Sequence, residues 1–264
     1  MIEPVGDPLD PRIEPYAGVR ERDLVGRDGA FIAEGRVVLE KLIAAGRHPV
    51  RSVLVAEPKA PGLADVLTRL DPAIPVYMAS QAVMDALVGF HIHRGVLALG
   101  ERRETEAPTL LAGLPDKALV VGLSAVANHD NMGGVFRNAA AFGADAVLLD
   151  SDCCDPLYRK AIRVSVGAAL TTPFARLPRG VDMVELLSAA GFEAVSLSPR
   201  GATQLTEYQP APRTAVIFGA EGPGLAEAVM ARTRTVRIAM SGGFDSLNLA
   251  TTSGIVLHAL ARRA

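Results

Sequence analysis

The order of apolar and polar residues in the second half of the chain restricts the fold more than any other sequence feature. Four short apolar runs are separated there by segments with apolar residues at helical spacing. Strands that alternate with helices in this way form βα units, whose strands lie in a parallel sheet. The runs are residues 118–123, 146–149, 193–197 and 214–218, and the helical segments are residues 131–142, 158–170, 181–190 and one ending near residue 231. The second half is therefore predicted to be an α/β domain built on a parallel sheet.

The first half of the chain has the same alternation on a smaller scale. It predicts a second, smaller α/β domain over residues 29–104, with a largely parallel sheet. Four prolines favour an extended N-terminal arm over residues 1–28. Residues 105–116 combine charged side chains with two prolines and are predicted to be a linker, so that the larger domain is residues 117–264.

The last stretch of the chain combines a short strand, a glycine-containing loop and a helix. Apolar residues alternate over residues 236–240, which predicts a buried strand. Asp245 or Ser246 is then expected to cap a helix that continues to about Ala261. Gly254 costs roughly 1 kcal/mol relative to Ala inside a helix, so the helix is expected to be tightly packed or to begin at a ligand site. By itself, the stretch could also be an ordinary last helix on a sheet.

Composition excludes several classes of protein. No run approaches the ~18 apolar residues that span a membrane, and the acidic, proline-rich start is unlike a signal peptide. Cys153 and Cys154 are the only cysteines and are adjacent, which is typical of a reducing compartment; we expect the cytoplasm. The net charge of −2 gives no overall signature of nucleic-acid binding, so any RNA contact must come from local basic patches.

Three segments rich in glycine and small polar residues follow strands of the larger domain. They are residues 128–138, 219–224 and 241–246. Ligands of open α/β sheets bind at the carboxyl ends of strands, so chemistry is expected in these loops. Gly133 and Gly134 are expected to let the backbone approach a ligand. The spacing G-x-x-G-x-G at 219–224, with Glu221 and Pro223 inside it, is unlike a phosphate-binding loop.

Taken together, the three segments resemble the motifs of the SpoU/TrmH family of SPOUT-superfamily RNA 2′-O-ribose methyltransferases. The matching residues are Asn131, Gly133, Arg137 and Ala139; Gly219, Glu221, Gly222 and Gly224; and Ile238, Met240, Gly242, Ser246, Leu247 and Asn248. Lys160 to Leu170 also resembles a family segment, and Glu34-Gly35 and His93-Arg94-Gly95 resemble parts of its substrate-binding domain. The chain departs from the family pattern at Ala239, Arg94 and residues 250–252.

The resemblance implies a fold, a cofactor and partners. The fold is a C-terminal parallel-sheet SPOUT domain with a trefoil knot, plus a smaller N-terminal α/β domain that binds RNA substrate. S-adenosyl-L-methionine is expected to lie in the knot, and the enzyme is expected to be a homodimer. Backbone groups are expected to hold the cofactor at Leu197, Gly219, Ile238, Met240 and Leu247.

The resemblance also implies two further groups of site residues. The expected catalytic group is Arg137, Asn131, Ser246, Asn248 and Glu221, with the Arg137 charge beside the reacting ribose oxygen. The residues expected to bind RNA through phosphates are Arg47, Arg51, His93, Arg94, Arg102 and Arg103. No metal is needed, and the sequence has no His/Cys ligand cluster.

Two alternatives from other classes remain open. A nucleotide-binding oxidoreductase would carry G-x-G-x-x-G after its first strand with an acid ~20 residues on, and this pattern is absent. A catalytically inactive RNA-binding homologue would be expected to lack some of the polar motif residues, which are all present. The sequence does not distinguish rRNA from tRNA as the substrate; rRNA is the preferred expectation.

Overall fold

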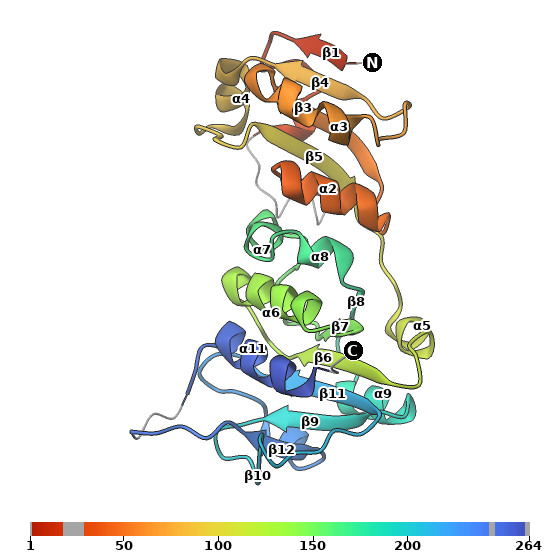
Figure 1. Cartoon of the computed structure of the whole chain (residues 1–264), viewed down its shortest axis with the longest axis vertical. Coiled ribbons are helices and arrows are strands. Elements are labelled where there is room, and N and C mark those ends of the chain that lie inside the picture. The colour runs from red at the N-terminus through yellow and green to blue at the C-terminus, as the bar shows by residue number, and fades with distance from the viewer. Residues whose placement is uncertain (1, 18–28, 243–245, 262–264) are drawn as a thin grey trace. The chain divides into compact units, whose positions relative to one another are not determined.

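The chain divides into two compact units in a computed structural model that describes residues 2–17, 29–242 and 246–261 (Figure 1). The N-terminal unit contains Met1–Arg103 and Leu157–Thr171. The C-terminal unit contains Glu104–Pro156 and Thr172–Ala264. The change of unit near residue 104 lies where the sequence places the end of the smaller domain. The grouping of Leu157–Thr171 with the N-terminal unit has no counterpart in the sequence-based division.

The N-terminal unit is built on a five-stranded sheet of order β1-β4-β3-β5-β2. Its strands are β1 (Ile2–Val5), β2 (Ala30–Glu34), β3 (Val50–Ala56), β4 (Val76–Ala79) and β5 (Val96–Glu101). Strand β4 pairs in parallel with β1 and β3, whereas β5 is antiparallel to both β2 and β3. The strands β1, β2, β3 and β4 thus run in one direction, as expected for a largely parallel sheet, and β5 runs against them. Apolar alternation indicates which segments are strands but says nothing about their direction.

Short helices surround this sheet. They are η1 (Glu14–Tyr16), α2 (Arg36–Ala45), η2 (Glu57–Leu63), α3 (Ala64–Leu67), α4 (Gln81–Val88), α7 (Arg159–Val164) and α8 (Ala168–Thr171). Ser80 caps α4, because its hydroxyl accepts a hydrogen bond from the Val83 amide at 3.3 Å. Helix α4 therefore begins where a local polar group satisfies an amide of its first turn.

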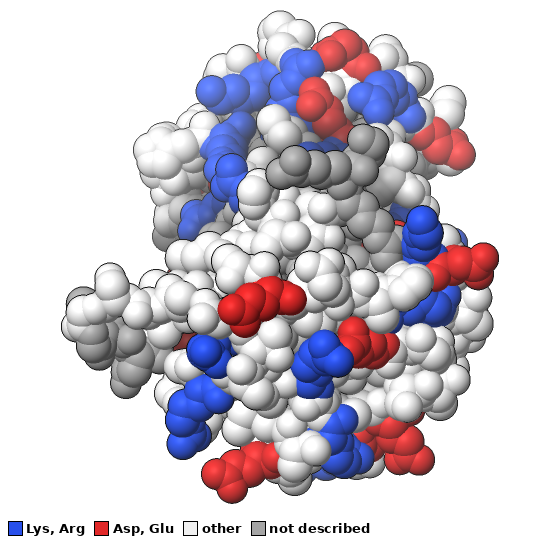
Figure 2. All heavy atoms as spheres, turned by 60° about the horizontal axis from the view of Figure 1, so that its bottom comes forward, with Lys and Arg blue, Asp and Glu red and all other residues white. Residues whose placement is uncertain are grey.

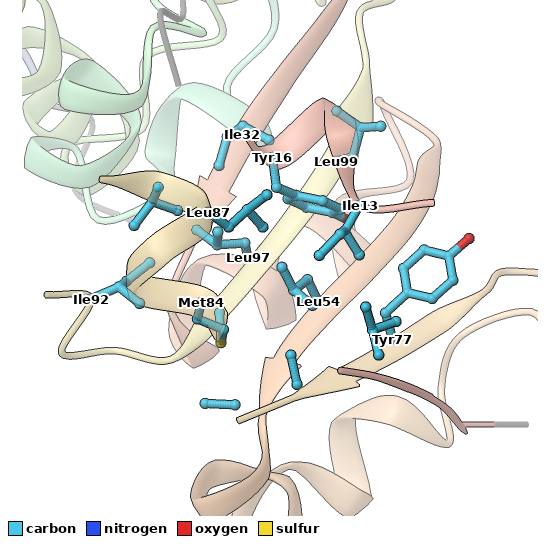
Figure 3. Close-up of a cluster of buried hydrophobic side chains, with 14 of the residues drawn as sticks. Ile13, Tyr16, Ile32, Leu54, Tyr77, Met84, Leu87, Ile92, Leu97 and Leu99 are labelled. Atoms are coloured by element: carbon cyan, nitrogen blue, oxygen red, sulfur yellow. The ribbon is translucent and has the colours of Figure 1, made fainter. Parts of the chain in front are cut away.

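The segment predicted to be an N-terminal arm takes part in the core of this unit. Ile2–Val5 is a sheet strand, and Ile13 and Tyr16 are fully buried. Figure 3 shows both side chains among Leu54, Leu97 and Leu99. The Tyr16 hydroxyl also lies 2.6 Å from the Ser52 hydroxyl, which provides its buried polar atom with a partner. Prolines favour extended backbone, as the sequence indicated, but apolar burial decides where that backbone lies; residues 18–28 are outside the described part.

The segment 158–170, which was predicted to include a helix, contains two short ones, α7 and the start of α8. Val166 and Gly167 both have positive φ angles, of 53° and 79°, between α7 and α8. A Cβ at Gly167 would lie 3.1 Å from Lys41 Cδ of α2, so this glycine also allows α2 to approach. The helical spacing of apolar residues did not reveal the break, because α7 and α8 both bury apolar side chains.

The C-terminal unit contains a seven-stranded sheet of order β10-β12-β9-β11-β6-β7-β8. Its strands are β6 (Ala118–Leu123), β7 (Ala146–Leu149), β8 (Phe174–Arg176), β9 (Glu193–Leu197), β10 (Thr203–Gln204), β11 (Arg213–Phe218) and β12 (Arg234–Arg237). Every neighbouring pair is parallel, which confirms the predicted parallel sheet. The central strands are buried on both faces, as continuous apolar runs indicate.

Helices cover both faces of the parallel sheet (Figure 1). They are α5 (Ala107–Ala112), α6 (His129–Ala141), α9 (Met183–Ala189), α10 (Glu227–Met230) and α11 (Leu249–Leu260). Leu111 of α5 and Leu187 of α9 share a buried cluster with Ala175 of β8. The next β8 side chain, Phe174, contacts the ring of Phe136 of α6 at 5.7 Å between centroids, on the opposite face. The predicted linker, residues 105–116, thus contributes a helix to the core.

Helices α6 and α11 lie against each other at unusually short range. A Cβ at Gly134 would lie 2.5 Å from Ala250 Cβ, and one at Gly254 would lie 3.2 Å from the Asn138 amide nitrogen. The Asn138 amide also donates to the Ala250 carbonyl at 2.6 Å. Gly133 and Gly134 are therefore inside a helix, and Gly134 admits a second helix; the expectation of a ligand-facing loop there is wrong. Tight packing at Gly254 was predicted and is confirmed.

One buried histidine of the N-terminal unit, His48, should make the stability of the fold depend on pH in a testable way. Burial, followed by the neighbouring Arg47 charge, lowers the pKa of His48 to about 4. The unfolded value is about 6.5, so between these values the unfolded chain binds a proton that the folded chain does not. The contribution of neutral His48 to the free energy of unfolding is therefore fully present above pH ~6.5 and is lost as the pH falls towards 4.

His48→Gln should reduce this acid sensitivity. In the wild type, His48 Nδ1 accepts a hydrogen bond from the Arg103 amide at 3.2 Å. The side-chain oxygen of glutamine can accept the same hydrogen bond, and glutamine does not titrate. Urea unfolding at pH ~7.5 and ~4.5 should show that the wild type loses on the order of 1–2 kcal/mol more than the variant. Equal losses in the two proteins would mean that His48 does not titrate in this window.

Candidate active site

A cavity of about 180 Å³ opens at the carboxyl ends of the C-terminal sheet strands. Its walls come from the segments after β9, β11 and β12 and from the start of α11. All five residues predicted to hold the cofactor line it: Leu197, Gly219, Ile238, Met240 and Leu247. Ser246 lines it as well, whereas Phe218, Leu249 and Thr252 are lining residues that the sequence did not single out. Their position immediately beside motif residues is the signal that could have identified them.

Strand β12 is shorter than the sequence predicts, and this places two side chains in the cavity. The strand ends at Arg237, so Ile238 and Met240 lie beyond the sheet. The alternation over residues 236–240 therefore continues past the strand itself. The lining contains no Lys or Arg, so the cavity presents apolar side chains, backbone groups, the hydroxyls of Ser198, Ser246 and Thr252 and the single carboxylate of Glu221.

Two glycines beside the cavity lie so close to another segment of backbone that a side chain would not fit at either position. A Cβ at Gly219 would lie 2.3 Å from the Gly224 carbonyl carbon, and one at Gly201 would lie 2.4 Å from the Val236 carbonyl carbon. The Ser198 amide donates to the Val236 carbonyl at 3.0 Å, and the Leu205 amide to the Arg237 carbonyl at 2.8 Å. The Arg237 guanidinium donates in turn to the Gly201 and Ala202 carbonyls. Residues 198–205 and 236–237 are thus fixed side by side.

Three predicted catalytic residues from separate segments form one hydrogen-bonded network. The Asn131 amide donates to Glu221 Oε1. The Asn248 amide donates to Asn131 Oδ1 at 2.8 Å and lies 3.4 Å from Glu221 Oε1. Asn131 is buried, whereas Glu221 and Asn248 are exposed, so the network extends from the interior to the surface of the site.

The start of α11 depends on the same network. Asn248 is its cap, with the side-chain oxygen accepting from the Thr251 amide at 3.1 Å. The prediction that Ser246 caps this helix is wrong, and Asp245 lies outside the described residues. The sequence missed this because Asn, Asp and Ser are equivalent as caps, and three of them stand close together.

A second cavity, of about 210 Å³, shares Ala220, Glu221 and Leu249 with the first. Asn131 and residues 125–128 complete its lining. Ala125 has a φ of 53°, which an L-residue rarely adopts, and its amide donates to both carboxylate oxygens of Asp150 at 3.0 and 2.9 Å. Ser124 also donates to Asp150 at 2.7 Å. Asp150 therefore holds the turn that leads into α6, a role with no evident sequence signal.

Among the predicted catalytic residues, Asn248 and Arg137 line neither cavity. Asn248 nevertheless belongs to the hydrogen-bonded network, which leaves Arg137 as the predicted catalytic residue outside both the cavities and the network. Arg137 lies six positions after Asn131 on α6, about 240° around the helix axis. Its side chain is exposed, and no carboxylate of the described residues forms an ion pair with it. Its charge therefore faces solvent on a different side of the helix from the Asn131 network.

The predicted RNA-binding residues fall into two groups in the N-terminal unit. Arg102 and Arg103 follow the end of β5, near Arg47, whereas His93 and Arg94 precede its start, about 17 Å away along the strand. Arg51 belongs with the first group and pairs with Glu101 at 3.3 Å. Figure 2 shows Lys and Arg side chains close together on this unit, at the top of the view. The predicted RNA-binding residues therefore form two separate basic groups.

The described residues contain neither a metal-binding cluster nor a membrane-spanning helix. None of their His, Cys, Asp and Glu side chains gather in threes as a metal ion would require. Among the helices that the structure describes, none is long and apolar enough to cross a membrane.

Comparison with known proteins gives a consistent set of relatives. A family model described as "SpoU rRNA Methylase family" matches residues 118–258. An "Uncharacterized tRNA/rRNA methyltransferase" of Mycobacterium tuberculosis (strain ATCC 25618 / H37Rv) is 36% identical, covering 97% of this chain and 91% of its own length. These matches extend over the three motif segments that line the cavity.

Two solved structures share the fold. A crystal structure of an "AdoMet bound rRNA methyltransferase from Sinorhizobium meliloti" has a TM-score of 0.83 at 21% identity, covering 98% of this chain and 97% of that one. A crystal structure described as "RNA 2'-O ribose methyltransferase" has a TM-score of 0.76 at 24% identity, covering 97% of each chain.

The two roles of Asn248 can be separated by substitution. Asn248→Ala removes both the helix cap and the donated hydrogen bonds, whereas Asn248→Ser keeps a cap acceptor and loses only the donor. Urea unfolding should show a loss of ~1–2 kcal/mol for Ala and roughly half of that for Ser. Equal losses would assign the whole effect to the network, and no loss in either variant would show that neither contact stabilises the chain.

Proposed function

The chain belongs to the SpoU rRNA Methylase family, and we propose that it transfers a methyl group from S-adenosylmethionine to a ribose 2′-hydroxyl of RNA. The observation that carries the proposal is the Asn131–Glu221–Asn248 network, whose Glu221 carboxylate lines both cavities. Two cavities that meet at one carboxylate suit a reaction between two bound molecules. The RNA is rRNA or tRNA, of which rRNA is the preferred substrate.

The residues of the first cavity fit S-adenosylmethionine. The structural relative from Sinorhizobium meliloti is an AdoMet-bound enzyme, and AdoMet is this same cofactor. Leu197, Ile238 and Leu247 give apolar walls for an adenine ring. Without a lysine or arginine in its lining, the cavity does not repel a positively charged sulfur. When bound, S-adenosylmethionine supplies an electrophilic methyl group on that sulfur.

The second cavity offers the partners that a ribose needs. The Asn131 and Asn248 amides fix the Glu221 carboxylate, whose oxygens can accept a hydrogen bond from the attacking hydroxyl. Ser246, on the rim of the first cavity, adds a further polar group. Holding the hydroxyl in line with the methyl group can supply ~7–11 kcal/mol of the barrier. These residues therefore act chiefly by positioning.

Arg137 is proposed to provide the positive charge that the cavities lack. An exposed guanidinium is available to an RNA phosphate or to the ribose oxygen as that oxygen loses its proton. Because Arg137 lies away from the Asn131 side of α6, it can act only on RNA that reaches over this helix or on RNA held by a second chain. The proposal therefore includes a homodimer.

Helix α11 gives little support to that homodimer. Five of its side chains are large and apolar, and four of these are buried within the chain: Leu249, Val256, Leu257 and Leu260. Only Ile255 is exposed, at 39%. The homodimer is therefore proposed on the family resemblance, with Arg137 as the residue that would use it.

The trefoil knot and the location in the cell also belong to the proposal. The side-by-side course of residues 198–205 and 236–237, with no space for a Cβ at Gly201, is what a chain threaded through a loop requires. Cys153 and Cys154 are both free thiols, which suits a reducing cytoplasm.

Methyl transfer to RNA tests the proposed function directly. The full chain is incubated with S-adenosylmethionine carrying a labelled methyl group and with total RNA that lacks the modification. After digestion, the label should appear in a 2′-O-methylnucleoside from one RNA species. Label on a base would refute the ribose acceptor, and absence of label despite cofactor binding would favour the inactive homologue.

Arg137 variants test the catalytic assignment in the same assay. Arg137→Ala should slow single-turnover transfer on the order of 10²–10³-fold, by analogy with loss of an oxyanion-stabilising donor. Arg137→Lys keeps the charge but loses the planar fork, so it should also be impaired. Arg179→Ala removes an equally exposed arginine and serves as the control. Transfer by Arg137→Ala within a few-fold of wild type would make Arg137 a surface residue without a catalytic role.

A further inference from the structure

The loop between α4 and β5 displays aromatic and basic side chains on a rigid backbone. Phe90, His91, His93 and Arg94 are all exposed, whereas Ile92 between them is 1% exposed. Figure 3 shows Ile92 pointing into the core of the N-terminal unit. The loop is thus anchored by its one buried side chain, with its polar and aromatic groups turned to solvent.

The carboxylate of Asp85 in α4 fixes this loop through hydrogen bonds. The carboxylate accepts from the Ile92 amide at 3.0 Å and from Gln81 at 2.7 Å, and it lies 2.7 Å from His91 Nδ1. Gln81 also donates to the Ile92 carbonyl at 3.1 Å. A loop tied by backbone contacts at its centre loses little conformational entropy when a ligand binds to it.

Phe90 and Arg159 form the centre of the display. Phe90 is 43% exposed, and the Arg159 guanidinium carbon lies 5.1 Å from its ring centroid. Arg159 is held there by Glu34, whose carboxylate is 3.0 Å from Arg159 Nη1 and whose residue is only 8% exposed. The Glu34 carboxylate is therefore turned inward, while the Arg159 guanidinium lies beside the Phe90 ring.

Arg94 is placed on the same side of the unit by the glycine next to Glu34. Gly35 has a φ of 100°, and a Cβ there would lie 2.9 Å from Arg94 Cδ. Arg94 Nη1 donates to the Glu34 carbonyl at 3.3 Å. The rings of His91 and His93 lie edge to face, 4.5 Å apart between centroids. Arg94 and Arg159 are thus both held at Glu34, Arg159 also lies against the exposed Phe90 ring, and the two histidine rings contact each other in the loop that follows Phe90.

We propose that this surface, made of Phe90, His91, His93, Arg94 and Arg159, binds an unpaired base of the RNA substrate together with its phosphate. Every base has a flat face that stacks on an aromatic ring or guanidinium plane, and the phosphate pairs with arginine. An apolar protein partner would need more than one exposed apolar side chain here. The inference rests on the proposed function, since it takes RNA as the substrate, and it adds that the substrate presents a single-stranded nucleotide to the N-terminal unit.

Binding of a short RNA to the full chain tests the proposal. The probe is a fluorescent single-stranded RNA of about ten nucleotides, compared with a duplex of the same length. Phe90→Ala should weaken single-strand binding about tenfold and leave the salt dependence unchanged, because it removes stacking and no charge. Arg94→Ala should instead reduce the salt slope by about one.

Two further variants separate stacking from simple burial. Phe90→Leu keeps an apolar side chain against Arg159 without a flat ring, and should bind as weakly as Phe90→Ala. Phe90→Trp should restore or strengthen binding. Leu9→Ala, an exposed apolar truncation elsewhere in the unit, should have no effect. Thermal melting of each variant checks that it is folded.

Several results would overturn the inference. They are equal affinity of Phe90→Ala and wild type, wild-type affinity in Phe90→Leu, and duplex binding as tight as single-strand binding. Absence of any single-strand binding by the wild type would do the same. The proposed methyl transfer is measured separately with the cofactor, so transfer to RNA without a Phe90 effect would reject only this base-binding surface.

Discussion

The hydrogen bonds between Asn131, Glu221 and Asn248 join segments that are up to 117 residues apart in the chain. One partner also stabilises a helix start, because Asn248 caps α11, and Asn131 lies in the first turn of α6. The carboxylate of Glu221 is thereby fixed at the boundary of two cavities. The site depends on this network because its two asparagine amides tie the three motif segments to one carboxylate.

Close backbone approach makes the network possible. Helices α6 and α11 meet at Gly134 and Ala250, and the chain segments behind the cavity cross at Gly201 and Gly219. At each position a methyl group would collide with backbone or with a packed helix. Gly134, which was interpreted as ligand-facing, is thus a packing residue, and it acts on the site by bringing its walls together.

The sequence predicted the parallel sheet of the C-terminal unit because strands buried on both faces are continuous apolar runs. It also identified residues that share a cavity, since Leu197, Gly219 and Met240 follow or end three different strands of that sheet. It could not give the antiparallel direction of β5 or the break at Val166, because the pattern of burial is the same for either direction and on both sides of the break. The burial of Ile13 and Tyr16 escaped it because prolines dominate that segment.

The central claim is that the apolar cavity holds S-adenosylmethionine, and calorimetric titration of a Met240→Lys variant tests it most directly. Met240 is only partly buried, so the chain should stay folded, while a lysine would place a positive charge beside the charged cofactor. The account predicts binding at least about tenfold weaker than wild type, a change of ~1.4 kcal/mol, with Met240→Leu within a few-fold of wild type. Wild-type affinity in Met240→Lys would show that the cofactor binds elsewhere.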